Sequence, residues 1–135
     1  VGIHPKVLAG DGVIGIEAGG KAEGMYISSA YLPDRPGDRN AAFVKAYQAR
    51  NPGLLPDHRG AGAYDIIYLL RRALANGATT RQEIRDYLAG VGTKSAKFDG
   101  VTGAIAFDEQ REVPAKDVVI GQVQSKRLVT VAAGK

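Results

Sequence analysis

The chain has 135 residues, of which 44% are hydrophobic and 24% charged, a balance that is normal for a soluble globular protein and enough for one domain with a real core. The absence of cysteine excludes disulfides and thiolate zinc sites, but it fits an oxidising or a reducing compartment equally well. The net charge is +4, yet basic residues are scattered and only 7% of residues are aromatic, which argues against a nucleic-acid partner.

The first part of the chain predicts two strands on either side of a glycine-rich loop. Lys6–Ala9 is expected to end a strand, and Gly24–Tyr31 has the composition of another strand. The loop between them begins with the sequence GDGVIG, Gly10–Gly15. Leu32–Asn40 follows with two prolines, one glycine and four charges, which predicts an exposed connector.

Three helices are predicted in the middle of the chain. The first is expected to have Asn40 as its cap and to stop at Asn51–Gly53. The second, Asp57–Ala75, has the longest helical pattern, and the third begins with a capping box, Thr80–Glu83. Five apolar residues of the second helix recur at helical spacing and are predicted to be core: Ala63, Ile66, Ile67, Leu70 and Leu74.

The last part of the chain predicts strands. Ala104–Phe107 is expected to be a nearly buried strand, and Asp117–Val123 and Arg127–Val131 are expected to pair around a short polar turn. The order of elements indicates an α/β protein, but one with too few strands to accommodate three helices. Either another copy of the chain completes the sheet, or part of the protein is missing.

The loop Gly10–Gly15 matches the G-x-G-x-x-G spacing of dinucleotide-binding proteins, in which glycines allow a pyrophosphate to approach a helix N-terminus. The preceding strand is short, however, and Asp11 would place a carboxylate where the phosphates should lie. These two features weaken the match, and a small nucleotide-binding domain built on this loop is kept as an alternative function.

Asp11 itself has two interpretations. A carboxylate on a glycine-flanked turn at the end of a strand is well placed to face a crevice and to pair with a ligand cation. It is also well placed to cap a short helix over Val13–Ala18, which is the commoner use of aspartate at such a position.

The remaining polar residues do not predict an enzyme or a cofactor. His4 and His58 are too few for a tetrahedral metal site. His58 and Arg59 precede the long helix and could line a ligand cleft, although solvated loop residues are the simpler interpretation. No Gly-x-Ser-x-Gly elbow is present, so nucleophilic catalysis has little support.

Four motifs follow one another along the chain, a Gly-Asp-Gly turn, a proline-rich crossover, an Ala-Tyr-Asp helix and a Phe-x-Gly-x-x-Gly…Phe-Asp signature: Gly10–Gly12, Leu32–Asn40, Ala63–Asp65 and Phe98–Asp108. Their order and spacing resemble the C-terminal part of branched-chain amino-acid-type substrate-binding proteins of ABC transporters, which are type I periplasmic binding proteins. Two departures are Arg111 and Ser125–Lys126, which stand where the family usually has glycine.

The resemblance implies an incomplete α/β fold of the type I periplasmic-binding-protein class, with Rossmann-like three-layer lobes, of which this chain would be a C-terminal fragment. Residues 1–31 would end the second lobe, residues 32–115 would return through the first lobe, and residues 116–135 would form the C-terminal hairpin of the second lobe.

The resemblance also implies a solute-binding component of an ABC importer, periplasmic or otherwise outside the cytoplasm, that binds an amino acid or a related small molecule between its lobes. The permease would be its partner, and no catalysis is expected. A ligand-sensing receptor domain of the same fold is the alternative that the resemblance leaves open.

By position, Asp11 would pair with the ligand's α-ammonium, Gly12 would lie beside it, and Arg59 would fall near the side-chain pocket. An arginine there is unusual for an aliphatic ligand, so the ligand could also be polar, acidic or aromatic. The fragment alone is expected to bind ligand weakly or not at all, and its unpaired sheet surface is expected to cause homo-oligomerisation or strand exchange.

Overall fold

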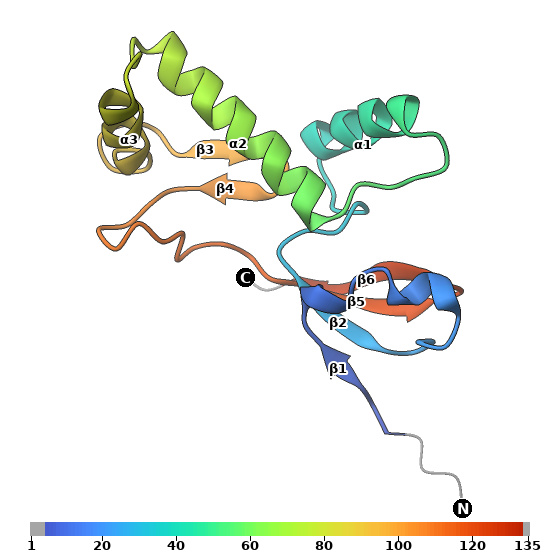
Figure 1. The fold of residues 1–135 in the computed structure, drawn as a ribbon. Coiled ribbons are helices and arrows are strands. Elements are labelled where there is room, and N and C mark those ends of the chain that lie inside the picture. Colours follow the sequence, from blue (N-terminus) through green and yellow to red (C-terminus); the bar gives the residue numbers. More distant parts are fainter. Residues whose placement is uncertain (1–4, 134–135) are drawn as a thin grey trace, which may run out of the picture. The chain divides into compact units, whose positions relative to one another are not determined.

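The computed structural model describes residues 5–133, which divide into two compact units. The first unit joins Val1–His58 to Asp117–Lys135, and the second is Arg59–Lys116. Within the described residues, the first unit holds a four-stranded sheet and the second a two-stranded sheet (Figure 1). The mixture of helices and strands that the sequence predicts is therefore confirmed, with a sheet in each unit.

The sheet of the first unit makes neighbours of strands from both ends of the sequence. β1, Leu8–Ala9, is parallel to β2, Tyr26–Ser29, and β2 is antiparallel to β5, Val119–Gln124. β6, Arg127–Ala133, pairs antiparallel with β5 and completes the order β1-β2-β5-β6. The strands predicted in these regions are thus confirmed, with β1 and β2 shorter than expected.

The core of this sheet is small and apolar. Ile27 of β2 and Val123 of β5 are fully buried, and Ala22 packs with them. The β5–β6 hairpin turns through Ser125 and Lys126, whose φ angles of 50° and 63° are left-handed. Two successive positive φ angles suit the twist of a two-residue hairpin, but each costs a non-glycine residue about 1 kcal/mol.

The first α-helix, α1, spans Asp38–Arg50, so Asn40 lies inside its first turn and the interpretation of Asn40 as the cap is wrong. The buried Asn40 amide donates to the carbonyl oxygens of Pro33 at 3.0 Å and Arg35 at 2.6 Å. Its side-chain oxygen accepts a hydrogen bond of 2.7 Å from the Tyr31 hydroxyl. Because buried polar groups need partners, Asn40 holds the connector against the helix instead of starting it.

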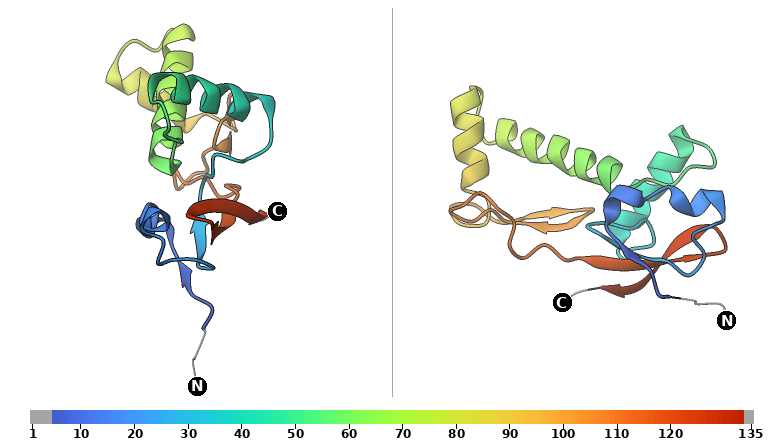
Figure 2. Two further views of the ribbon diagram at one scale, coloured as in Figure 1. Left: turned by 90° about the vertical axis from the view of Figure 1, so that its right-hand side faces the viewer. Right: turned by 60° about the horizontal axis from the view of Figure 1, so that its bottom comes forward.

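The second unit is formed by two helices and a β-hairpin. α2 spans His58–Ala75 and α3 spans Arg81–Ala89, while β3, Phe98–Gly100, pairs antiparallel with β4, Gly103–Ile105. α2 lies along the hairpin (Figure 2). β3 is a strand that the sequence analysis does not predict, and its partner β4 begins and ends earlier than expected. The buried core of this unit contains four apolar residues: Leu69, Val91, Phe98 and Ile105.

The capping box at the start of α3 is confirmed. The Thr80 hydroxyl accepts from the Glu83 amide at 3.2 Å, and the Glu83 carboxylate accepts from the amides of Thr79 and Thr80, each at 2.8 Å. Hydrogen bonds from the Thr79 and Thr80 backbone stabilise the charged carboxylate and lower the pKa of Glu83 to about 2.

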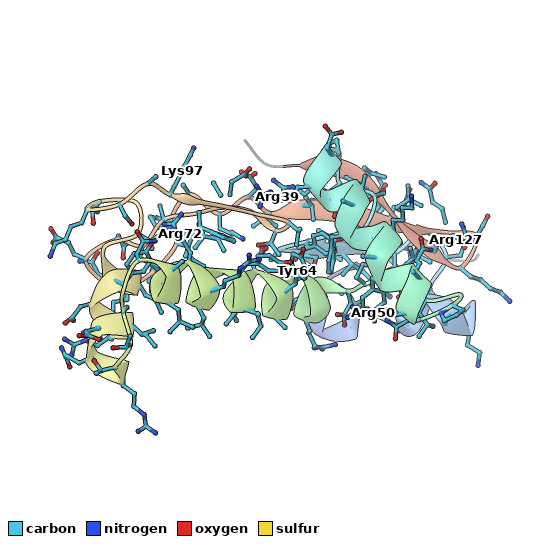
Figure 3. All side chains as sticks on the ribbon, turned by 90° about the horizontal axis from the view of Figure 1, so that it is seen from above. Arg39, Arg50, Tyr64, Arg72, Lys97 and Arg127 are labelled. Carbon is cyan, nitrogen blue, oxygen red and sulfur yellow. The ribbon has the colours of Figure 1, made fainter. Side chains whose placement is uncertain are left out.

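Arg72 connects α2 to the segment that leads into β3. Its guanidinium donates to the carbonyl oxygens of Ala96 at 2.6 Å and Lys97 at 3.2 Å, and to the Tyr87 hydroxyl at 2.9 Å. Arg72 and Lys97 are labelled in Figure 3. The planar guanidinium can serve several acceptors at once, which explains an arginine at this position.

Asp65 joins α2 to the turn between β3 and β4. Asp65 is only 2% exposed. Its carboxylate accepts hydrogen bonds from the amides of Val101 at 2.8 Å and Thr102 at 2.9 Å. The Thr102 hydroxyl donates to the same carboxylate at 2.6 Å and accepts from the Lys116 ammonium. This explains the aspartate of the Ala-Tyr-Asp motif, because it satisfies the amides of a buried turn.

The predicted core face of α2 is largely wrong. Ile66 and Ile67 are 57% and 62% exposed, and Leu74 is also exposed. The buried residues of the helix lie on another face: Ala61, Asp65, Leu69 and Ala73. The face packed in this structure is the one that carries the Asp65 carboxylate, so the helix has an apolar stripe left open. None of the helices between residues 5 and 133 combines enough length and apolarity to cross a membrane.

Candidate functional site

The loop after β1 places Asp11 on the surface of the first unit. It forms two 3₁₀ turns, η1, Asp11–Val13, and η2, Ile16–Gly19. Gly15 separates them with a φ of 109°, a conformation that glycine adopts without steric cost. The Asp11 side chain is 53% exposed, so its carboxylate is accessible to a small molecule.

The helix predicted over Val13–Ala18 is therefore replaced by these turns, and the capping role of Asp11 is wrong. Gly10 occupies the N-cap position of η1, and no side chain caps either turn. The density of glycine in this segment explains the outcome, because glycine disfavours a continuous α-helix. The other interpretation of Asp11, as a carboxylate that faces a crevice and pairs with a ligand cation, stays a prediction.

The geometry of the same loop does not support the nucleotide-binding alternative. A dinucleotide fingerprint needs an α-helix whose N-terminal amides receive the pyrophosphate. Here the loop leads into a three-residue 3₁₀ turn, and within the described residues no α-helix begins before Asp38.

The Asp11 carboxylate lies beside the ring of His58, the first residue of α2. Asp11 Oδ2 lies 3.6 Å from His58 Nε2, which is longer than a hydrogen bond. The His58 side chain is only 15% exposed, and its Nδ1 atom is buried without a hydrogen-bond partner. The interpretation of His58 as a solvated loop residue is therefore wrong. The only sequence signal for its role is its position just before the long helical pattern.

A cavity of about 480 Å³ in the first unit includes His58 in its wall. Its apolar lining consists of eight residues: Ile14, Tyr31, Leu32, Pro33, Leu55, Pro56, Leu128 and Val129. Its charged lining residues besides His58 carry both signs: Glu17, Asp34, Asp57, Lys126 and Arg127. A cavity of this size with apolar walls and charges of both signs suits a small ligand with an apolar body and polar ends.

The other two predicted site residues, Gly12 and Arg59, are both exposed. Gly12 is the exposed second residue of η1, and a Cβ atom there would meet nothing within 4 Å. Arg59 is the exposed second residue of α2 and begins the second unit, whereas Asp11 and Gly12 belong to the first. His4 lies outside the described residues, and among those described no group of three or more histidine, aspartate or glutamate side chains is placed to hold a metal ion.

Residues 1–127 match the model of a family described as periplasmic binding protein. Among solved structures, a leucine-binding protein from Thermotoga maritima matches with a TM-score of 0.80 and 27% identity, over 97% of this chain and 37% of its own. A branched-chain amino acid transporter substrate-binding protein from Streptococcus pneumoniae, in complex with isoleucine, matches with a TM-score of 0.79 and 28% identity, over 98% of this chain and 37% of its own.

A solute-binding protein of an ABC transporter from Rhodopseudomonas palustris, in complex with benzoate, matches over 88% of this chain and 32% of its own. Its TM-score of 0.70 at 21% identity shows a shared fold. The chain thus spans about a third of the length of these proteins, and its fold is that of an incomplete type I periplasmic binding protein.

Proposed function

Because this chain belongs to the periplasmic binding protein family, we propose that it supplies one part of the solute-binding protein of an ABC importer, acting outside the cytoplasm. The ligand is an amino acid or a related small molecule, and the permease of the transporter receives it. The relatives named above are binding proteins, and the proposal includes no catalytic step.

Asp11 is the residue that binds the ligand's ammonium group, with the backbone of Gly12 beside it. The observation that supports this role is an accessible carboxylate, held on a glycine-rich turn, whose nearby partner is a histidine in the wall of a cavity. A carboxylate in that position favours a cation, and the cavity can receive the apolar part of an amino acid. Arg59 contributes to side-chain selection in the whole protein.

In the whole protein, binding is coupled to closure of the two lobes. We propose that residues 1–31 and 116–135 belong to one lobe and residues 32–115 to the other, a division that differs from the two compact units of this chain, whose boundary lies between His58 and Arg59. A ligand that contacts both lobes stabilises the closed state, because it makes more favourable interactions there than in the open state. That closed state is the form which the permease recognises.

The affinity of this chain alone follows from the few contacts it provides. One charge-assisted hydrogen bond contributes roughly 1.5–3 kcal/mol. That free energy corresponds to a dissociation constant on the order of ten to a hundred millimolar, whereas micromolar affinity needs about −8 kcal/mol. We therefore expect weak binding of ammonium-bearing ligands to this chain.

The experiment is an amide NMR titration of the chain with leucine and two analogues that each lack one charged group. Leucine and isoamylamine, which have an ammonium group, should shift the amide resonances of Asp11 and Gly12, and isocaproate, which lacks it, should not. Asp11→Asn should abolish these shifts, while the matched change Asp38→Asn, at an exposed carboxylate of the same unit, should preserve them.

Equal shifts with isocaproate, or shifts that survive Asp11→Asn, would contradict the role of Asp11. Micromolar binding of leucine by calorimetry would contradict the weak affinity expected of this part of the protein.

A further inference from the structure

A second cavity, of about 350 Å³, lies wholly within the second unit and is lined by α3 and by the segment that follows β4. Six residues form its wall: Arg85, Asp86, Leu88, Ala89, Phe107 and Arg111. It therefore shares no residue with the cavity that includes His58. A volume of this size is enough for a small organic molecule.

The apolar part of this wall is held by the core of the second unit. Leu88 and Phe107 are half-buried and pack against the buried core of that unit. The Phe107 amide also donates a hydrogen bond of 2.9 Å to the carbonyl oxygen of Val91. Because both side chains are held by the core while their residues line the cavity, they offer a preformed apolar surface. Covering such a surface is favourable for an apolar group of a ligand.

The charged part of the wall contains one cation that lacks an acidic partner. Asp86 is neutralised within α3, because its Oδ1 atom accepts from Arg85 Nε at 3.0 Å and Nη2 at 2.6 Å. Its other oxygen accepts from the Gln82 amide at 2.9 Å. The Arg111 side chain, by contrast, makes no hydrogen bond or ion pair with any residue of the described part of the chain. The wall is therefore complementary to an anion.

The backbone at Arg111 shows that the arginine is not there for stability. Its φ of 66° is a conformation that glycine adopts freely and a residue with a side chain does not. The turn around it is closed by Asp108, whose carbonyl oxygen accepts from the Arg111 amide at 3.0 Å and whose carboxylate accepts from the Glu112 amide at 2.8 Å. Strained residues held in this way are typical of positions that bind a ligand.

We propose that this cavity binds a small carboxylate that carries an apolar body the size of one ring. The body lies against Leu88 and Phe107, and the carboxylate accepts hydrogen bonds from the Arg111 guanidinium. An apolar cation would meet the wrong charge, and an inorganic anion would leave the apolar wall uncovered. The site is separate from Asp11 and takes the opposite charge, so it is independent of the proposed function.

The test is an amide NMR titration of the chain with 3-phenylpropionate. A ligand of about eleven non-hydrogen atoms should bind with a dissociation constant on the order of a millimolar and shift the amides of Leu88, Ala89 and Phe107. The alcohol 3-phenylpropan-1-ol has the same ring and chain without the charge. It should bind roughly three- to tenfold more weakly, between the effect of an exposed ion pair and that of a buried charged hydrogen bond. 3-Phenylpropylamine should bind no better than the alcohol.

Three variants separate recognition of the carboxylate from folding. Arg111→Gln should bind 3-phenylpropionate as weakly as the unchanged chain binds the alcohol, and its affinity for the alcohol should stay the same. Arg111→Gly should lose the same preference without a fall in its unfolding temperature, because it relieves the backbone strain. Arg81→Gln is the matched control, since Arg81 is an exposed arginine of α3 outside the cavity, and it should keep full binding.

Equal affinity for the acid and the alcohol, or carboxylate binding that survives Arg111→Gln, would overturn the proposal. So would an absence of shifts, or shifts confined to the first unit. The titration that tests Asp11 uses other ligands and follows other amides, so the failure of one site leaves the result for the other intact.

Discussion

The two compact units differ in what determines the surface they bury. The first unit buries apolar side chains, Ile27 and Val123, in a sheet whose strands come from distant parts of the sequence. In the second unit, the packed face of α2 carries the acidic Asp65, while Ile66 and Ile67 remain exposed. A helix with two candidate faces is thus oriented here by a buried carboxylate and its hydrogen bonds, whereas hydrophobic periodicity would choose the other face.

The difference between the packed and the exposed face of α2 is considered together with the share of its relatives that this chain spans. The exposed stripe on α2 contains Ile66, Ile67 and Leu74, and this chain spans 37% of the length of the leucine-binding and isoleucine-bound proteins with which it shares its fold. The packed face depends only on residues present here, through the bonds from Asp65 to Val101 and Thr102. The stability of the second unit should therefore respond strongly to changes on one face of α2 and weakly to changes on the other.

The largest effect is expected for Asp65→Ala. It removes three hydrogen bonds to a carboxylate that is 2% exposed and leaves two buried amides without partners. We expect the free energy of unfolding of the second unit to fall by about 3–5 kcal/mol. Urea unfolding followed by circular dichroism measures it, and a loss below about 1 kcal/mol would mean that Asp65 does not determine the packed face.

A smaller loss is expected for Gly100→Ala, because a Cβ atom at this buried position would collide with the Asp65 carboxylate. Overpacking of this kind costs about 1–3 kcal/mol. Gly62→Ala is the matched control, since a Cβ on this α2 residue meets nothing within 4 Å. It should instead stabilise the unit by up to about 1 kcal/mol through helix propensity. Equal effects of both changes would refute the contact between Gly100 and Asp65.

Relief of backbone strain should give a gain of similar size in each unit. Arg111 in the second unit has a φ of 66°, and Lys126 in the first has a φ of 63°. Replacing either by glycine should stabilise its unit by about 0.5–1 kcal/mol, because glycine adopts this conformation freely but loses more entropy on folding. Thermal unfolding of the two variants measures the gain, and a loss in either would show that its side chain makes a contact worth more than the strain.

The smallest effect on stability is expected on the open face of α2. Ile67→Lys should change the free energy of unfolding by less than about 0.5 kcal/mol, whereas Leu69→Ala, two residues away and buried, should cost about 2–5 kcal/mol. Light scattering of Ile67→Lys should also show less self-association if copies of the chain cover the stripe. A loss above about 1.5 kcal/mol in dilute Ile67→Lys would mean that the stripe is covered in a single chain.

The sequence predicts the local signals of this fold well. The capping box at Thr80, the end of α2 at Ala75 and the C-terminal hairpin are each determined by neighbouring residues, and all three are confirmed. Asn40 is mistaken for a cap because its actual partners, Tyr31 and the connector carbonyls, meet it only after folding. The prediction of the packed face of α2 fails for the same reason, since the Asp65 carboxylate accepts hydrogen bonds from amides 36 and 37 residues away.

The candidate site likewise contains one residue that a local motif predicts and one that only the folded chain reveals. The position of Asp11 follows from a local motif, the glycine-flanked turn after a strand, and its side chain is exposed there, while its role in binding stays a prediction. His58 is 47 residues away, and no periodicity or motif connects it to Asp11. Only the folded first unit brings the two side chains together, so a sequence signal for this pair does not exist in a single chain.

The most direct test of the account is an intermolecular nuclear Overhauser measurement between isoamylamine and the isotope-labelled chain. The account predicts contacts from the carbon next to the ammonium group to the Gly12 amide and the His58 ring, and their loss in Asp11→Asn. Contacts that survive in Asp11→Asn, or that fall only on residues of the second unit, would contradict it.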